Sequence, residues 1–259
     1  SLQRALNEVV RRHPVLRTSF HAGKSGPVRR VHEESQLRIT FDDLTVVSNT
    51  LREEALEMTW KIETQVMYPM ETVPLFRIRV VKVGAKQHTL FFSAHHIIAD
   101  AWSSWVLTRE LLTLHESYRL GRQASLGPVA SYADVAQSVT EVDDRWWDSY
   151  LADLSPPPPQ ENTQVHEAHI EIDAEHWSRL QARASRTSST PFMLTIYALF
   201  RSLMEVKGTS DLVISTALSG REGHLETLAG VVGPFARALP IRAQAPLSLE
   251  SVVASLEQA

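Results

Sequence analysis

The stretch "HHIIADAWS" (His95–Ser103) decides how the rest of the chain is interpreted. It follows the apolar run "LFFSA" (90–94), which is typical of a buried strand, and it leads into a tryptophan-rich pattern that predicts a helix. Successive side chains of a strand point to opposite faces, so we expect His95 to face the packed interior and His96 to face a cleft. Two diverging histidines are a poor metal site, because a metal needs ligands that converge.

The residue chemistry gives His96 and Asp100 two readings each. His96 would hold a metal together with Asp100 if the turn brought the two side chains together, but no glutamate or cysteine stands nearby at a zinc spacing, and proton transfer is the favoured reading. A neutral imidazole at a strand end is suited to proton transfer near pH 7. Asp100 stands just before the predicted helix, which is the usual N-cap position of an aspartate, and the cap is the favoured reading. The alternative is a buried carboxylate that pairs with an arginine and holds the loop of His96. With Asp100 as the cap, Ala101 would stand at the start of the helix, where a free backbone N–H and the helix dipole stabilise negative charge.

The composition excludes several classes of protein. The 259 residues are enough for one large or two modest domains, and a net charge of −4 does not suggest a nucleic-acid binder. Cysteine is absent, which removes disulfides, thiolate metal sites and a cysteine nucleophile, and which fits a reducing, cytoplasmic compartment. No apolar run approaches the roughly 20 residues of a membrane helix. Both ends carry helical patterns with no clear start or stop, so we expect a piece of a longer chain.

The first half of the chain mixes strands and helices. A helix ending near His13 precedes predicted strands over 15–20, 27–33 and 36–41, followed by a helix over 46–67. Two long strands over 74–83 and 87–96 flank "GAK" as a hairpin. We expect the second of them to be central and covered on both faces. A helix follows over 101–120 and ends at Gly121, and shorter helical pieces cover 131–139 and 143–154.

The run "SPPPPQENTQ" (155–164) is the clearest predicted boundary, because consecutive prolines form an extended connector. Beyond it we expect a strand over 165–172, a helix around Trp177 and another over 190–207. Strands over 211–218 and 235–243 and a terminal helix complete the pattern. The sequence therefore predicts an α/β (α+β) protein with one lobe at 1–154 and a second, partial lobe at 165–259.

Four segments in one order carry a resemblance to a known family. "HHIIADAWS" resembles the HHxxxDG motif of the condensation domains of nonribosomal peptide synthetases. "RHPVLRTSF" (12–20), "SYADVA" (131–136) and "VVGPFARALPIR" (231–242) are similar to the family segments RHExLRTxF, YxDFAVW and IGxFVNTLPLR. Epimerisation domains usually continue the histidine motif with SW, and here Trp105 falls one place late. Condensation is therefore the better fit.

The resemblance implies two chloramphenicol acetyltransferase-like lobes in a V-shaped pseudo-dimer with a tunnel between them. Two carrier proteins would bring substrates on phosphopantetheine arms to opposite ends of the tunnel, and the domain itself would bind no cofactor and no metal. The implied reaction joins a donor thioester to an acceptor amine in an amide bond. An ester-forming relative with a hydroxyl acceptor and a non-catalytic module that docks carrier proteins remain as alternatives.

The motifs also imply roles for single residues. His96 aligns with the catalytic histidine, either as a base or as a group that orients the amine. His95 and Asp100 align with structural positions, and Arg17 is the expected partner of Asp100. Ala101 stands where the family keeps glycine, so that its methyl group would narrow access to His96.

Further departures lie elsewhere in the sequence. Arg237 replaces the asparagine of FVNT, and Ala238 replaces its threonine. Arg237 and Trp102 are candidates for the wall of the tunnel. Arg237 either contacts a carboxylate of an unusual substrate or simply faces solvent. The family's opening strand and last two motifs are not found in the chain, which would leave a sheet edge or part of the tunnel open.

Overall fold

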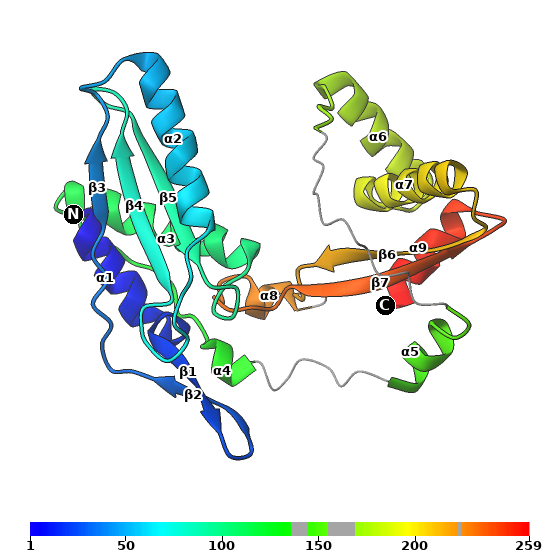
Figure 1. Ribbon diagram of the computed structural model, residues 1–259, viewed down its shortest axis with the longest axis horizontal. Coiled ribbons are helices and arrows are strands. Elements are labelled where there is room, and N and C mark those ends of the chain that lie inside the picture. Colours follow the sequence, from blue (N-terminus) through cyan, green and yellow to red (C-terminus); the bar gives the residue numbers. More distant parts are fainter. Residues whose placement is uncertain (136–143, 155–168, 222–223, 259) are drawn as a thin grey trace. The chain divides into compact units, whose positions relative to one another are not determined.

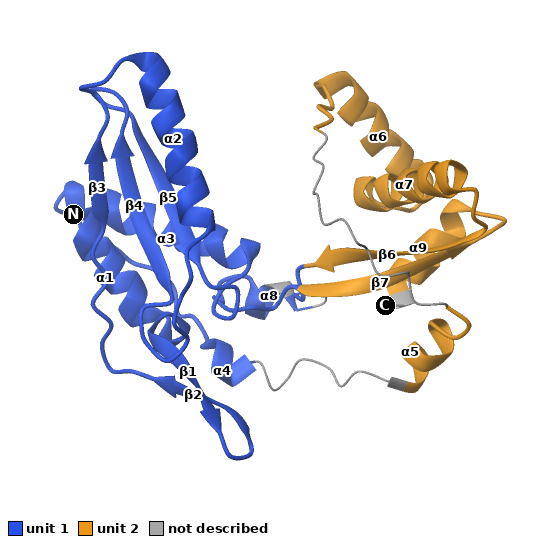
Figure 2. Ribbon diagram, viewed as in Figure 1, with its two compact units in different colours: residues 1–140, 219–236 blue, residues 141–218, 237–259 orange. Residues whose placement is uncertain are grey.

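A computed structural model describes residues 1–135, 144–154, 169–221 and 224–258. The chain forms two compact units, one of residues 1–140 and 219–236, the other of residues 141–218 and 237–259 (Figure 2). This division differs from the predicted lobes at two places. Residues 141–154 group with the second unit, and residues 219–236 return to the first. The predicted connector over 155–164 lies outside the described residues.

The first unit is built on a three-stranded sheet (Figure 1). Strand β4 (Phe76–Lys82) lies in the middle, parallel to β3 (Thr40–Asp43) and antiparallel to β5 (His88–Ala94). The hairpin predicted around "GAK" is therefore confirmed. The central position predicted for its second strand is wrong, because β3 pairs with β4 and leaves β5 at the edge among the described strands.

The two faces of β4 follow from its alternating sequence. Phe76 and Ile78 point into an apolar core with helices α1 (Leu2–Arg12) and α3 (Ala101–Arg119). Arg77 and Arg79 point the other way and pair with Glu63, which is buried near the end of helix α2 (Asn49–Thr64). One face of the sheet thus packs into the apolar core, and the other carries ion pairs to α2.

A β-hairpin follows the first helix. Strands β1 (Thr18–Gly23) and β2 (Gly26–Val31) pair antiparallel. The strand predicted over 15–20 begins late, because Pro14–Arg17 form a 3-10 turn, η1. Proline fits this first helical position, where its missing N–H costs no hydrogen bond. The short helices α4 (Tyr132–Val135) and α8 (Leu225–Leu228) complete the first unit.

The second unit has an antiparallel pair of strands, β6 (Asp211–Leu218) and β7 (Arg237–Gln244). Helices α7 (Pro191–Lys207) and α9 (Leu249–Gln258) share a core with alternate residues of β7, namely Leu239, Ile241 and Ala243. Helices α5 (Asp144–Tyr150) and α6 (Ala174–Arg186) belong to the same unit. Within the described ranges, no helix is long and apolar enough to cross a membrane.

The predicted elements of this half of the chain are mostly confirmed. Helices appear around Trp177 and over 191–207, and strands over 211–218 and 237–244. Of the strand predicted over 165–172, residues 169–172 are described and have no strand structure. The mixed α/β class is confirmed by both units.

Candidate functional site

The two adjacent histidines lie on the turn that follows β5. The backbone N–H of His95 donates to the carbonyl of Leu75 at 2.9 Å, which extends the ladder beyond the strand. Its ring accepts a hydrogen bond at Nδ1 from the N–H of Ile97 at 3.1 Å and meets the ring of Tyr68 edge-on. His95 is half-buried and holds the turn, whereas His96 is exposed. The two histidines therefore differ in exposure, but both lie beyond the end of β5 and both line one groove, so the strand alternation expected from the sequence does not apply to them.

A groove of about 390 Å³ lies beside His96. It runs between the end of α2 and the outer edge of β5. Its wall combines the ring of Trp60 with the hydroxyl of Tyr68, which donates to the carbonyl and hydroxyl oxygens of Ser93 at 2.9 Å. The groove is lined by Trp60, Glu63, Thr64, Val66, Tyr68 and residues 91–96. His96 is thus open to solvent at a groove that follows the strand edge.

Asp100 is buried at the start of α3 and accepts hydrogen bonds on both carboxylate oxygens. Oδ1 accepts hydrogen bonds from the N–H and the hydroxyl of Ser103, each at 2.7 Å. Asp100 is therefore the N-cap of α3, as predicted from the sequence. Oδ2 takes the N–H groups of Phe235 and Ala236 at 3.1 Å. One side chain therefore caps the helix and fixes the backbone of the returning segment 219–236.

The charge of Asp100 is matched by Arg221, not by Arg17. Arg221 is fully buried, and its Nη1 donates to Oδ2 of Asp100 at 2.7 Å. The same guanidinium donates to the carbonyls of Ser219 and Val231, so that it also ties down its own segment. A buried carboxylate paired with an arginine, the alternative to the cap, is therefore present as well. Both readings of Asp100 hold at once.

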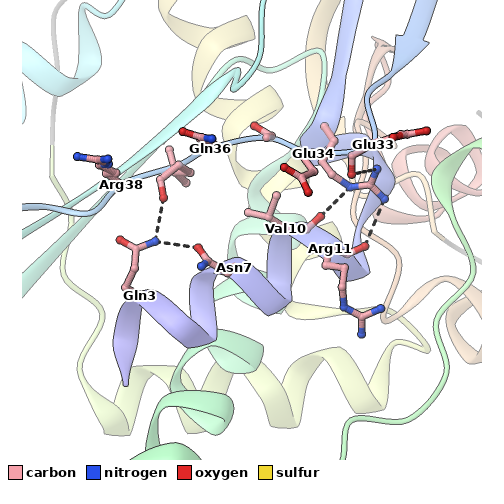
Figure 3. A pocket seen from close by; sticks show the side chains of 11 residues that line it. Gln3, Asn7, Val10, Arg11, Glu33, Glu34, Gln36 and Arg38 are labelled. Atoms are coloured by element: carbon pink, nitrogen blue, oxygen red, sulfur yellow. Dashed lines mark hydrogen bonds between the residues drawn. The ribbon is translucent and has the colours of Figure 1, made fainter.

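The prediction that Arg17 pairs with Asp100 is wrong. Arg17 donates to backbone carbonyls of its own neighbourhood, among them those of Val10, Arg11 and His32. It lines a separate pocket of about 440 Å³ between α1 and residues 33–38 (Figure 3). The end of a helix leaves carbonyl groups without partners, and the nearby guanidinium of Arg17 satisfies two of them.

Two glycines allow the returning segment to approach so closely. Gly220 has a φ of 68°, and a Cβ there would lie 1.9 Å from the carbonyl oxygen of Phe235. A Cβ on Gly233 would lie 2.2 Å from the ring of Tyr132. Any side chain at either position would displace the backbone beside Arg221 or the aromatic packing of Tyr132 against Phe235. Arg221 was missed from the sequence, and the only local signal for it was its place in the loop "SGREG".

The remaining residues expected at the site have different positions. Ala101 is the first residue of α3 and is exposed. Trp102 is half-buried, and its indole N–H donates to the carbonyl of Ala229 at 2.9 Å, so its polar group holds the returning segment. Arg237 is exposed at the start of β7 in the second unit. The structure does not bring Arg17 to the histidines.

The electrostatics of the site keep Asp100 ionised. Burial by itself would raise the pKa of Asp100, but the hydrogen bonds from Arg221 and Ser103 outweigh burial and lower this pKa below its ordinary value. A carboxylate that stays charged beside a charged guanidinium does not exchange protons near neutral pH. Among the residues of this turn, His96 is the exposed group that is able to accept or donate a proton.

The described residues contain no group of three or more histidine, aspartate or glutamate side chains placed to hold a metal ion. The site combines an exposed histidine on a surface turn with the buried ion pair of Asp100 and Arg221, which lies at the start of the helix that follows this turn.

The comparison with protein families agrees with the site. The chain matches the family model of the condensation domain over residues 1–258, and it belongs to that family. Condensation domains of nonribosomal peptide synthetases are acyltransferases that form peptide bonds.

Curated relatives are large synthetases. The chain is 28% identical to phosphinothricin tripeptide synthetase PhsB of Streptomyces viridochromogenes, over 93% of this chain and 22% of that protein. It is also 28% identical to tyrocidine synthase 3 of Brevibacillus parabrevis, over 95% of this chain and 4% of that protein. The chain thus spans less than a quarter of either relative.

Solved structures share the fold. The first condensation domain of the calcium-dependent antibiotic synthetase, in complex with substrate analogue 2a, superposes with a TM-score of 0.81 at 19% identity. That match covers 99% of this chain and 64% of the other. SgcC5 from Streptomyces globisporus superposes with a TM-score of 0.77 at 23% identity, over 98% of this chain and 61% of SgcC5.

Proposed function

We propose that the chain is part of a condensation-type acyltransferase that forms an amide bond between two substrates, each delivered on a carrier protein. The observation that carries the proposal is an exposed histidine on a turn braced by a buried ion pair, in a chain of the condensation-domain family. The acceptor amine would attack the thioester carbonyl of the donor. A C–N bond forms, the C–S bond breaks, and the amine proton leaves by way of His96 to the thiolate of the donor arm.

His96 does not need to act as a strong base in this reaction. An α-amino group has an ordinary pKa of about 7.7–8.0, so a useful fraction is already unprotonated near neutral pH. His96 would mainly orient this amine and take up its proton as the tetrahedral intermediate forms. His95, Asp100 and Arg221 would act as positioning residues, because their polar groups are committed to the turn, the helix and the returning segment.

The wider setting follows from the same proposal. The two units would be parts of two acetyltransferase-like lobes, with further parts of such a domain beyond the segments seen here. The partners would be donor and acceptor carrier proteins of the cytoplasm, whose phosphopantetheine arms hold the substrates. Trp102 and Arg237 would lie near the path of these arms.

Replacing His96 tests the proposal directly. With loaded donor and acceptor carrier proteins, H96A is expected to lower the rate of product formation by about 10²-fold or more, since a positioned acid–base group contributes on that scale. The matched control is H88A, which removes an exposed histidine from the other end of β5. Retention of most of the activity in H96A, with the product identified by mass spectrometry, would overturn the proposal.

A second candidate is a module of the same fold that binds other proteins without catalysis. Ala101 in the glycine position is the observation that favours it. One solved relative of the fold, the X-domain from teicoplanin biosynthesis, is described in complex with OxyB, with a TM-score of 0.74. Carrier binding without turnover on any amine or hydroxyl acceptor would support this candidate. Turnover of an amine acceptor would end it, and turnover of only a hydroxyl acceptor would indicate an ester-forming enzyme.

A further inference from the structure

A second cavity, of about 170 Å³, lies next to the histidine turn in the first unit. Ile97, the residue after His96, forms part of its wall. The rest of the wall comes from η1, both strands of the β1–β2 hairpin, the start of α4 and Pro234 of the returning segment. Its volume corresponds to about six water-sized groups. The cavity is therefore too small for a whole substrate and large enough for one side chain.

The wall of this cavity is mainly apolar, and two of its polar groups are already used. The hydroxyl of Thr18 donates to the carbonyl of Pro14 at 2.9 Å. The hydroxyl of Ser131 accepts from the N–H of Asp134 at 3.3 Å. Neither hydroxyl is therefore fully free to bind a ligand.

Arg29 and Tyr132 are different. Within the part of the chain that the structure describes, neither the guanidinium of Arg29 nor the hydroxyl of Tyr132 forms a hydrogen bond or an ion pair. The two groups interact electrostatically with each other. Burial raises the pKa of Tyr132, the charge of Arg29 opposes this, and Asp100 adds to it, so the phenol keeps its proton near neutral pH. An apolar cavity thus has one cation and one hydroxyl donor with no protein acceptor.

The ring of Tyr132 is held in place by the site itself. It packs edge-on against Phe235, with ring centres 4.9 Å apart, and Gly233 leaves room for it. The N–H of Phe235 is one of the donors to Asp100. The wall of the cavity and the brace of the histidine turn are therefore one connected structure.

We propose that this cavity is a side-chain subsite for one of the two substrates, and that it takes a single aromatic ring bearing a carboxylate. The rings of Phe20 and Tyr132 and the prolines at 14 and 234 supply flat apolar contacts for a six-membered ring. The guanidinium of Arg29 supplies the partner that a carboxylate requires at the rim. The inference rests on the proposed function for the role of the ligand, but not for its binding.

The hairpin provides a matched control for Arg29. Arg29 and Arg30 are neighbours on β2, both are exposed, and successive side chains of a strand point to opposite faces. Arg29 lines the cavity and Arg30 does not. R29M and R30M therefore remove the same charge from the same strand, and only the first removes it from the cavity.

The experiment measures binding of benzoate and of its neutral analogue benzamide by titration of the amide signals of Ile97 and Tyr132 in NMR spectra. Benzoate is expected to bind the wild type with a dissociation constant of about 1 mM, as usual for a fragment of this size. R29M should raise the dissociation constant of benzoate about fivefold or more and change that of benzamide by less than about twofold. R30M should change neither. V31W, which fills the cavity from a half-exposed position, should abolish binding of both.

Absence of benzoate binding to the wild type would overturn the subsite, and so would equal weakening by R29M and R30M. H96A separates this inference from the proposed function, because it should bind benzoate like the wild type whether or not it turns over substrate. A second assay determines whether the donor or the acceptor places its side chain in the cavity. It uses carrier-bound substrates that carry a carboxylated ring either on the donor or on the acceptor. R29M should raise the half-saturating concentration of one of them alone, and an increase for neither would contradict the assigned role.

Discussion

Two buried carboxylates lie ten residues apart on the same helix, and they are neutralised in different ways. Asp100, at the start of α3, receives backbone N–H groups, a hydroxyl and the guanidinium of Arg221. Glu110, in the middle of α3, accepts hydrogen bonds from side chains alone among the residues that the structure describes. His13 contacts its Oε2 at 2.8 Å, and Nε of Arg12 lies 3.1 Å from both of its oxygens.

The difference separates two tasks. The donors of Glu110 come from the end of α1, so this carboxylate holds two packed helices together. The donors of Asp100 include the backbone of residues 235 and 236, so this carboxylate fixes the path of a chain segment. Side-chain donors adjust by rotating, whereas backbone donors move only if the segment moves. A site that must hold its geometry is better anchored by the second kind.

The largest expected effect is the loss of Asp100. In D100A, Arg221 would remain buried without its counter-charge, and breaking such a pair costs about 3–5 kcal/mol of unfolding free energy. Urea unfolding measures this global loss. Amide exchange at Ala236 measures the local one, because its N–H loses its acceptor.

The double variant D100L/R221M tests the physical reason for this loss. Replacing both charges with apolar groups removes the unpaired ion, so the double variant should be less destabilised than D100A. A loss below about 1 kcal/mol in D100A, with unchanged exchange at Ala236, would mean that the returning segment is held by other contacts.

Loss of the charge of Glu110 is expected to destabilise the fold less than the loss of Asp100. E110Q keeps the shape of Glu110 and one acceptor oxygen for His13, and it replaces the charged carboxylate by a neutral amide. Because Arg12 is partly exposed and remains solvated, we expect a loss of about 1–2 kcal/mol in urea unfolding. E116Q is the matched control, since Glu116 pairs with Arg119 on the exposed face of the same helix and should lose less than about 0.5 kcal/mol. Equal losses in the two variants would contradict the comparison.

The local parts of this arrangement were accessible from the sequence. Asp100 was recognisable as a cap because it stands immediately before a helical pattern, and caps are local. The hairpin over 74–96 was recognisable from two apolar runs around a short turn. Different exposures of His95 and His96 were expected from the alternation along a strand, but both residues lie on the turn beyond the end of β5.

The partner of Asp100 was not accessible, because it depends on where a distant segment returns. Arg221 is 121 residues away, and its place in the loop "SGREG" does not indicate where that loop lies in the fold. The same reason explains the order of the sheet. The short strand β3 pairs with β4 and makes it central, although the apolar run in β5 suggested the reverse. Long-range pairing, rather than local pattern, decides both features.

The smallest expected effect is the dependence of stability on pH, which tests whether the two carboxylates differ in their donors but not in their charge. The pKa of Asp100 and the pKa of Glu110 are both lowered in the folded protein, because hydrogen bonds and nearby cations outweigh burial in each case. A lowered pKa stabilises the fold fully above the ordinary value of about 4, and this contribution is lost as the pH falls through the folded value. The unfolding free energy should therefore decline below about pH 4, by at most about 1.4 kcal/mol per pH unit for each carboxylate. In urea titrations from pH 7 to pH 3, D100N and E110Q should each decline less steeply than the wild type, and a variant that follows the wild-type profile would show that its carboxylate is not held in the charged form.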